Sequence, residues 1–314
     1  MRQRSYQLIA GLLLIAGASV ISLAQAGDGW VVPRILNTNK MEWMPFPGTQ
    51  SKVHRYEKIL AEDPGSKTPA RWAVRMLYAP PGWEETGSVA QRSFAEYFEW
   101  AFFLAGELPF CSYDDPSDET CNLSMFKPGT FMDRPRYSVH GSADQKAEHG
   151  LPISKTGAIS LFWHERDAEE YFFGRPAPEK FLAMDKHIFT RPTETDTNEM
   201  EWQPHPMLKG WLVKRLADHK GITQISILHM PAGWIDQRNL GRQNRTQFRE
   251  FWYVLSGDMP MWYYKSPNLQ EPEMAILRNG YFVDLPARTV LGASKRSASR
   301  TGCSFLQIIR YDIK

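Results

Sequence analysis

The chain contains one stretch of sequence twice. "EWAFFLAGELP" at 99–109 and "EFWYVLSGDMP" at 250–260 both begin with a glutamate, continue through aromatic and branched residues, and end in Gly, an acid and Pro. Shifting the chain by 151 positions aligns 82–141 with 233–292 without a gap, with 14 identities in 60 positions. Chance at ordinary composition gives about four. An internal duplication of roughly 120 residues per unit therefore predicts two domains.

Within each unit the pattern is that of short β-strands. The runs "WAVRMLYAPPGW" and "ITQISILHMPAGW" are rich in strand-forming residues and stop at Pro and Gly. Further runs follow at roughly 8–15-residue spacing, which is typical of an all-β sandwich or barrel. Helical sequence is confined to the stretch 165–198, which includes "ERDAEEYFFG". We interpret it as a connector with a short helix.

The N-terminus has the three parts of a secretory signal peptide. Arg2 and Arg4 precede an apolar run, and Ala24-Gln25-Ala26 forms a small-x-small cleavage signal. We therefore expect residues 1–26 to be removed and the mature protein to be periplasmic or secreted. An uncleaved N-terminal anchor is the alternative. The expected domain boundaries are 27–165 for the first domain, 166–194 for the connector and 195–314 for the second domain.

Export changes how the charge and the cysteines are interpreted. The formal charge is +2, and the leader contributes two arginines and no acid, so the mature chain is neutral. A neutral chain carries no electrostatic signature of nucleic-acid or membrane binding. Cys111 and Cys121 flank a polar loop, and an oxidising compartment permits a disulfide between them. The alternative is that both stay reduced. Cys303, in an apolar run, is expected to be a buried thiol.

The turn glycines and the repeated glutamates resemble the motifs of the cupin family. In the first unit Gly87, Glu99 and Gly106 have the spacing of the first cupin motif, and the second motif reads Gly129, Pro135 and His140. The second unit repeats the pattern with Glu250, Gly257, Gly280, Pro286 and Leu291. The chain thus resembles a bicupin of the ChrR type (anti-sigma-factor-like). The resemblance implies an all-β fold of two tandem double-stranded β-helix (jelly-roll) barrels.

The resemblance also implies a metal site, which this sequence only partly supplies. Cupin enzymes hold a divalent metal with a His-x-His pair and a glutamate from the first motif and a histidine from the second. Here Ser93-Phe94-Ala95 replaces His-x-His. A divalent ion needs three or four protein ligands, so we expect neither a cofactor nor a metal. The alternative is a divalent metal in the first barrel only, with Glu99, His140 and His164 as its ligands. The second unit keeps only Glu250 and is expected to bind none.

Several functions remain open at this stage. The first is an exported enzyme in which Glu99 and His140 perform acid–base catalysis on a small polar or carbohydrate-like molecule, by an isomerase- or lyase-like reaction. The second is a non-catalytic binding or interaction module with degenerate pockets, and the third a metal-dependent oxygenase or lyase. The expected partner is a small-molecule ligand, and a homodimer is left open. The ligand-binding candidates beside the motifs are Tyr97, Tyr137, Arg92, Arg245, Glu250 and Arg288.

Two of these candidates carry a specific expectation. Alternation along a strand places Glu99, Ala101 and Phe103 on one face, which the cupin resemblance turns inward. His140 would then face Glu99, and a carboxylate bonded to the imidazole would raise the histidine's pKa. Arg245 belongs to an arginine cluster that grips a carboxylate or sugar acid if it turns inward, and is a solvated loop otherwise.

We predict that the exported protein begins close to Gly27, since the leader has all three parts of a cleavable signal. The intact mass of the exported fraction measures this directly. A periplasmic species that retains residues 1–26 would contradict it.

Overall fold

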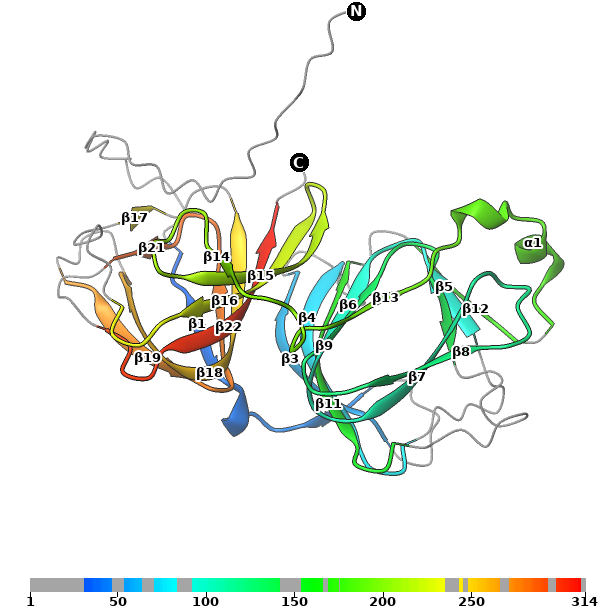
Figure 1. Cartoon of the computed structure of the whole chain (residues 1–314), viewed down its shortest axis with the longest axis horizontal. Coiled ribbons are helices and arrows are strands. Elements are labelled where there is room, and N and C mark those ends of the chain that lie inside the picture. The colour runs from blue at the N-terminus through cyan, green and yellow to red at the C-terminus, as the bar shows by residue number, and fades with distance from the viewer. Residues whose placement is uncertain are drawn as a thin grey trace, which may run out of the picture. The chain divides into compact units, whose positions relative to one another are not determined.

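A computed structural model provides the structure of the chain. It describes residues 31–46, 54–63, 71–83, 92–141, 154–165, 169–174, 176–234, 243–244, 248–265, 271–292 and 298–311. The expected signal peptide and Arg245 lie outside these residues. Across the described part of the chain the fold is nearly all β (Figure 1), which confirms the predicted fold class. In the same part, no helix is long and apolar enough to cross a membrane.

Two compact units divide the chain. One consists of Ile35–Glu201 with Gly280–Phe282, and the other of the remaining residues. The first repeat and the segment after it contain β1 (Arg34–Asn37), β2 (Met44–Pro45), β3 (Tyr56–Glu62), β4 (Trp72–Ala79), β5 (Arg92–Ala95), β6 (Glu99–Gly106), β7 (Leu108–Tyr113), β8 (Asn122–Phe126), β9 (Thr130–Arg134), β10 (Val139–Gly141), β11 (Ala158–Glu165), β12 (Glu170–Phe173), α1 (Glu179–Leu182) and the 3-10 helices Thr38–Lys40 and Lys186–Ile188.

The second repeat follows the same order. Its strands are β13 (Thr193–Asp196), β14 (Gln203–Pro204), β15 (Leu212–His219), β16 (Thr223–Met230), β17 (Gln243–Asn244), β18 (Arg249–Tyr263), β19 (Glu273–Arg278), β20 (Tyr281–Leu285), β21 (Val290–Leu291) and β22 (Cys303–Arg310). The long strand β18 covers the sequence equivalent to both β6 and β7. Strands β14 to β22 and β1 form one ten-stranded sheet, whereas β13 belongs to another sheet.

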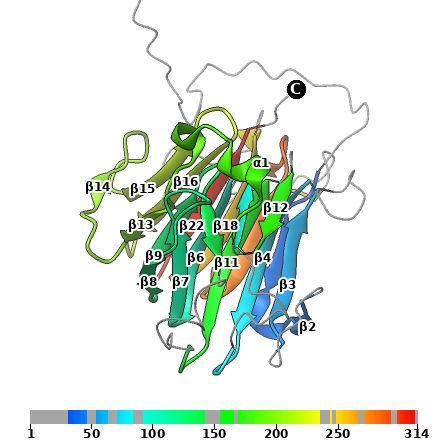
Figure 2. The same ribbon diagram turned by 90° about the vertical axis from the view of Figure 1, so that its right-hand side faces the viewer.

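In the first unit the strands form two sheets. The seven-stranded sheet has the order β13-β9-β6-β11-β4-β3-β2, and the five-stranded sheet the order β12-β5-β10-β7-β8. Figure 2 shows β4, β6 and β11 running side by side in the larger sheet. Residues 166–194, which the sequence analysis sets apart as a connector, contribute β12 to the smaller sheet and pack Phe181 and Phe189 against its core.

The first strand of each repeat is an edge strand in the sheet of the other repeat. β13 pairs with β9, and β1 lies next to β20. Thr38 and Thr197 follow these strands at equivalent positions, and each donates through its hydroxyl to a turn glycine carbonyl at 2.7 Å, Gly280 or Gly129. Equivalent threonines of the two repeats therefore bind equivalent turn glycines.

The glycine that ends the repeated phrase is required by close backbone packing. Gly106 has a φ of 72°, and a Cβ there would lie 1.9 Å from the carbonyl oxygen of Gly157. Gly257 repeats this geometry against Gly302, with a φ of 79° and the same 1.9 Å contact. No side chain fits at either position, so the duplication preserves this glycine for steric reasons.

The expected disulfide is present. Cys111 and Cys121 are bonded, with their Cα atoms 5.4 Å apart, and the bridge closes the loop between β7 and β8. Cys303 is a free, buried thiol, also as expected. Burial and the nearby Asp258 raise the pKa of Cys303 to about 12, so the thiol is unreactive at neutral pH.

We predict that Cys111→Ala/Cys121→Ala lowers the free energy of unfolding by about 2–3 kcal/mol, because a disulfide across ten residues restricts the unfolded chain. Chemical denaturation of the oxidised protein measures the loss. A reducing agent should destabilise the wild type and not the double variant. Equal stability of the two oxidised proteins would rule out a stabilising bridge.

Candidate functional site

The first barrel encloses a cavity of about 290 Å³. Alternate residues of its strands line it: Glu99, Ala101 and Phe103 of β6 do so, as the sequence predicts. The strand register gives the cavity two ends. Glu99 is paired with His164 at one end of β11, and Ala158 is paired with Ala79 at the other. Phenylalanine rings lie between these ends: Phe103, Phe110, Phe126 and Phe162.

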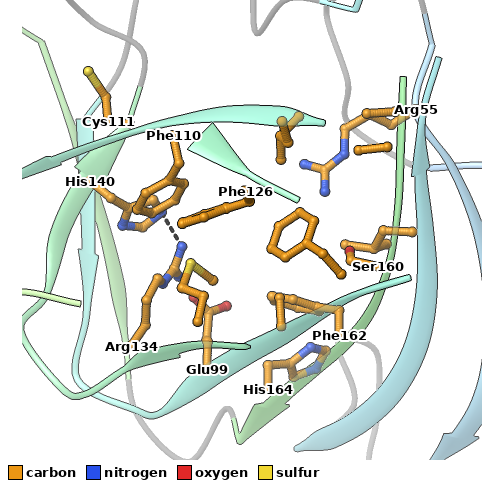
Figure 3. Close-up of a pocket in the computed structure, with 18 of the residues that line it drawn as sticks. Arg55, Glu99, Phe110, Cys111, Phe126, Arg134, His140, Ser160, Phe162 and His164 are labelled. Carbon is orange, nitrogen blue, oxygen red and sulfur yellow. Dashed lines mark hydrogen bonds and ion pairs between the residues drawn. The ribbon is translucent and has the colours of Figure 1, made fainter. Parts of the chain in front are cut away.

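A cluster of three charged or titratable side chains occupies the Glu99 end. Arg134 of β9 is the register partner of Glu99 and forms an ion pair with its carboxylate. The Nη1 of Arg134 also donates to Nε2 of His140 at 2.5 Å. Figure 3 shows the guanidinium between the carboxylate and the imidazole. Glu99 and His140 thus belong to one site, as predicted, but the arginine connects them.

The imidazole of His140 is held in one orientation. Its Nδ1 donates to the Ser138 carbonyl at 3.3 Å, which leaves Nε2 as an acceptor. The Ser93 hydroxyl lies 3.3 Å from Nε2, and the ring stacks on Phe110 at 5.7 Å between centroids. The accessible part of the ring contributes to the cavity lining. All of these contacts suit a neutral imidazole with its proton on Nδ1.

The expected pKa shift of His140 is wrong in sign. Burial, reinforced by the positive charge of Arg134, holds the pKa well below its usual value, and the hydrogen bond to Ser138 offsets this only in part. The expectation assumed that the imidazole would face Glu99. Because Arg134 stands between them, the nearest charge is a cation, which disfavours protonation.

The second repeat carries the same glutamate in different surroundings. Glu250 accepts hydrogen bonds from Trp252 Nε1 at 3.0 Å and Gln307 Nε2 at 2.9 Å, so its acceptor oxygen is satisfied inside the unit. The repeat places Trp252 at the position of Ala101, so a large ring replaces a methyl group. The positions of Arg134, His140 and His164 are occupied by Leu285, Leu291 and Ile309. The fold therefore forms without the charged cluster.

Comparison with solved structures identifies the architecture. No family model matches the chain, and no curated protein matches it. The crystal structure of protein Ylba from E. coli has a TM-score of 0.52 at 11% identity, covering 90% of this chain and 93% of that one. A mutant Bacillus subtilis oxalate decarboxylase has a TM-score of 0.53 at 14% identity, covering 91% of this chain and 79% of that one. The Lactobacillus farciminis oxalate decarboxylase formate complex has a TM-score of 0.52 at 11% identity, covering 91% of this chain and 88% of that one. The chain has a cupin fold. At these identities the likeness establishes the fold alone.

The charged cluster of this cupin barrel does not fit a metal ion. Among the described residues, no group of three or more His, Cys, Asp or Glu side chains converges as metal ligands do. The guanidinium of Arg134 binds Glu99 and His140, two of the three ligands that the sequence suggested. A cation beside that permanent positive charge would be repelled, and its ligands are already engaged. His164 is buried and lines the cavity next to Glu99.

The remaining sequence candidates have other surroundings. Tyr97 donates to Glu170 at 2.9 Å, and Tyr137 packs on the Phe94 cluster with a φ of 61°. The guanidinium of Arg92 lies 3.9 Å from the ring centre of Tyr113. Arg288 is exposed at the turn equivalent to that of Tyr137. Thus Glu99, His140 and His164 are the predicted residues that the fold brings into the cavity.

Sequence reasoning missed Arg134, Arg55 and the hydroxyl of Ser93, all of which line the cavity. The duplication contained a signal for Arg134, because the equivalent position in the second repeat is Leu285, just as Leu291 is the equivalent of His140. A polar residue at an inward position whose equivalent in the other repeat is apolar indicates a site present in one repeat. Arg55 lies in no motif, and only the fold reveals it.

We predict that acidification destabilises the protein from about pH 6.5 downward. A histidine whose pKa is lowered in the folded state binds its proton more readily when unfolded, so the free energy of unfolding decreases as pH falls below the unfolded value. His140→Leu should make the pH dependence of stability between pH 7 and 5 shallower, as measured by denaturant unfolding. The exposed His187→Gln is the control and should follow wild type. Equal slopes for His140→Leu and wild type would contradict the assignment.

Proposed function

We propose that the first barrel binds a small polar organic molecule and transfers a proton on it by acid–base chemistry at the Glu99–Arg134–His140 cluster, without a metal. The observation that carries the proposal is a titratable imidazole held neutral inside a cavity, next to a permanent cation. The second repeat supports it, because the equivalent positions there are apolar and its glutamate is satisfied by Trp252 and Gln307.

Each side chain has a distinct part in this mechanism. His140 presents Nε2 to the cavity as the base, and the hydrogen bond from its Nδ1 to Ser138 keeps that tautomer. Arg134 would turn from Nε2 to an oxygen of the substrate and stabilise negative charge as it develops there. Glu99 holds the guanidinium in place and balances its charge. Proton abstraction next to a carbonyl or at a hydroxyl is the reaction this arrangement suits best.

A second candidate is ligand binding without turnover. The observation that favours it is the hydrogen bond from Arg134 to Nε2, since it engages the lone pair that a base needs. The two candidates predict the same ligand site and differ in whether the bound molecule exchanges a proton.

We further propose that the mature protein is exported to the periplasm or secreted, as the leader of the sequence indicates. The ChrR-type relationship is likewise a proposal, supported by the motif spacing of the sequence. A homodimer remains compatible with both.

We predict that the full chain, treated with a chelator, catalyses hydrogen–deuterium exchange next to the carbonyl of small oxo-acids or sugars in deuterated water. Proton NMR follows the exchange over such a panel. His140→Leu should fold as the wild type does, because the second repeat has Leu291 at the equivalent position. Its rate of exchange should be at least about 100-fold lower. His229→Gln, in the other unit, is the matched control and should keep it.

The same spectra separate the two candidates. Compounds that shift the His140 resonances without exchanging support binding alone. A panel in which nothing shifts these resonances, or exchange that His140→Leu retains, would overturn the proposed site.

A further inference from the structure

The end of the cavity opposite the charged cluster contains a buried donor without an acceptor. Trp83 lines the cavity and is 9% exposed, and its buried Nε1 has no hydrogen-bond partner within the part of the chain that the structure describes. Arg75 also lines the cavity, but its guanidinium is ion-paired with Glu57 at 2.6 Å. Its register partner Phe162 places it nearer to His164. A buried donor left unsatisfied costs about 1–3 kcal/mol. In the same described part, Trp100 and Trp211 also have a buried Nε1 without a partner, but neither lines the cavity, whereas Trp83 does.

Arg55 stands beside the tryptophan. Its guanidinium carbon lies 5.1 Å from the Trp83 ring centre and 5.2 Å from that of Phe46, so two rings hold it in place. Figure 3 shows Arg55 across the cavity from Arg134 and His140, with its guanidinium directed inward and Phe126 in between. The planar guanidinium of arginine can stack on aromatic faces and bind a carboxylate through its edge.

The second repeat provides an internal comparison. Trp234 is the equivalent of Trp83, and its Nε1 donates to the Lys209 carbonyl at 3.0 Å. The same tryptophan thus has a backbone acceptor in one repeat and none in the other. Packing alone explains Trp234, whereas the indole N–H of Trp83 is left for a molecule in the cavity.

We propose that the ligand of the first barrel is a small organic carboxylate with an apolar body. Its carboxylate accepts hydrogen bonds from Trp83 Nε1 and Arg55, its body packs among the phenylalanine rings, and its far end reaches His140. This inference rests on the proposed function and specifies the ligand class. The unsatisfied group at this end is a donor and lies beside a guanidinium, which favours an acceptor such as a carboxylate over a cation.

The test compares two probes of equal size that differ in charge, 3-phenylpropionate and 3-phenylpropionamide. Isothermal titration to the full chain should show the carboxylate binding at least about tenfold more tightly. Trp83→Phe keeps the ring and removes the N–H, and should weaken the carboxylate about tenfold, the effect of one charge-assisted hydrogen bond. Arg55→Gln should weaken it by at least as much. Both variants should weaken amide binding by less than carboxylate binding, because the amide oxygen accepts a hydrogen bond but carries no charge.

Trp234→Phe is the matched control and should leave both affinities unchanged. Tighter binding of the amide, or carboxylate binding that Trp83→Phe and Arg55→Gln both retain, would overturn the ligand class. In that case amide binding that still shifts the His140 resonances would leave the proposed function standing. If neither probe binds, the carboxylate assignment is wrong, and the exchange panel then decides the proposed function separately.

Discussion

The first barrel depends on one interaction, the placement of Arg134 between Glu99 and His140. A buried carboxylate needs a partner, and the guanidinium supplies one on the neighbouring strand, at the register position directly opposite. The same guanidinium donates to the imidazole and, after burial, is the second cause that lowers the pKa of His140, so it acts on both partners. It also stands beside the groups that would otherwise hold a metal. The guanidinium of Arg134 thus supplies a permanent positive charge at this end of the cavity, where a metal-dependent site would need a bound metal ion to supply it.

The duplication shows which features the fold requires and which it does not. Both repeats keep the glycine that ends the β6-type strand, because the carbonyl of a facing glycine leaves no room for a Cβ. Both keep the glutamate, yet Trp252 and Gln307 satisfy it in the second repeat, whereas an arginine does so in the first. The cavity of the first barrel coexists with small side chains such as Ala101, where the second repeat has Trp252. The cavity-lining cluster of Glu99, Arg134 and His140 is therefore a feature of the first repeat that the shared fold does not require.

The sequence predicted the fold better than the site, for a physical reason. Strand alternation and turn glycines are local, so the repeated phrase sufficed to place Glu99, Ala101 and Phe103 on the inner face, and the loop between Cys111 and Cys121 sufficed for the disulfide. The partner of Glu99 is a cross-strand property. Arg134 follows 35 positions later, and only the antiparallel register of β6 and β9 makes it the nearest charge. The sign of the His140 pKa shift was mispredicted for the same reason. Arg55 and Trp83 come into contact only in the folded chain, and no sequence motif links the two positions.

The most direct test of this account is the protonation state of His140, measured by nitrogen-15 NMR of the imidazole in the full chain. We expect a neutral ring protonated at Nδ1, with a titration midpoint below pH 6.5, and a higher midpoint in Arg134→Gln because the neighbouring cation is gone. Arg249→Gln removes the equally carboxylate-bound arginine of the second repeat and should leave the His140 midpoint unchanged. A wild-type midpoint at or above pH 6.5, or one that Arg134→Gln does not move, would contradict the central role of Arg134.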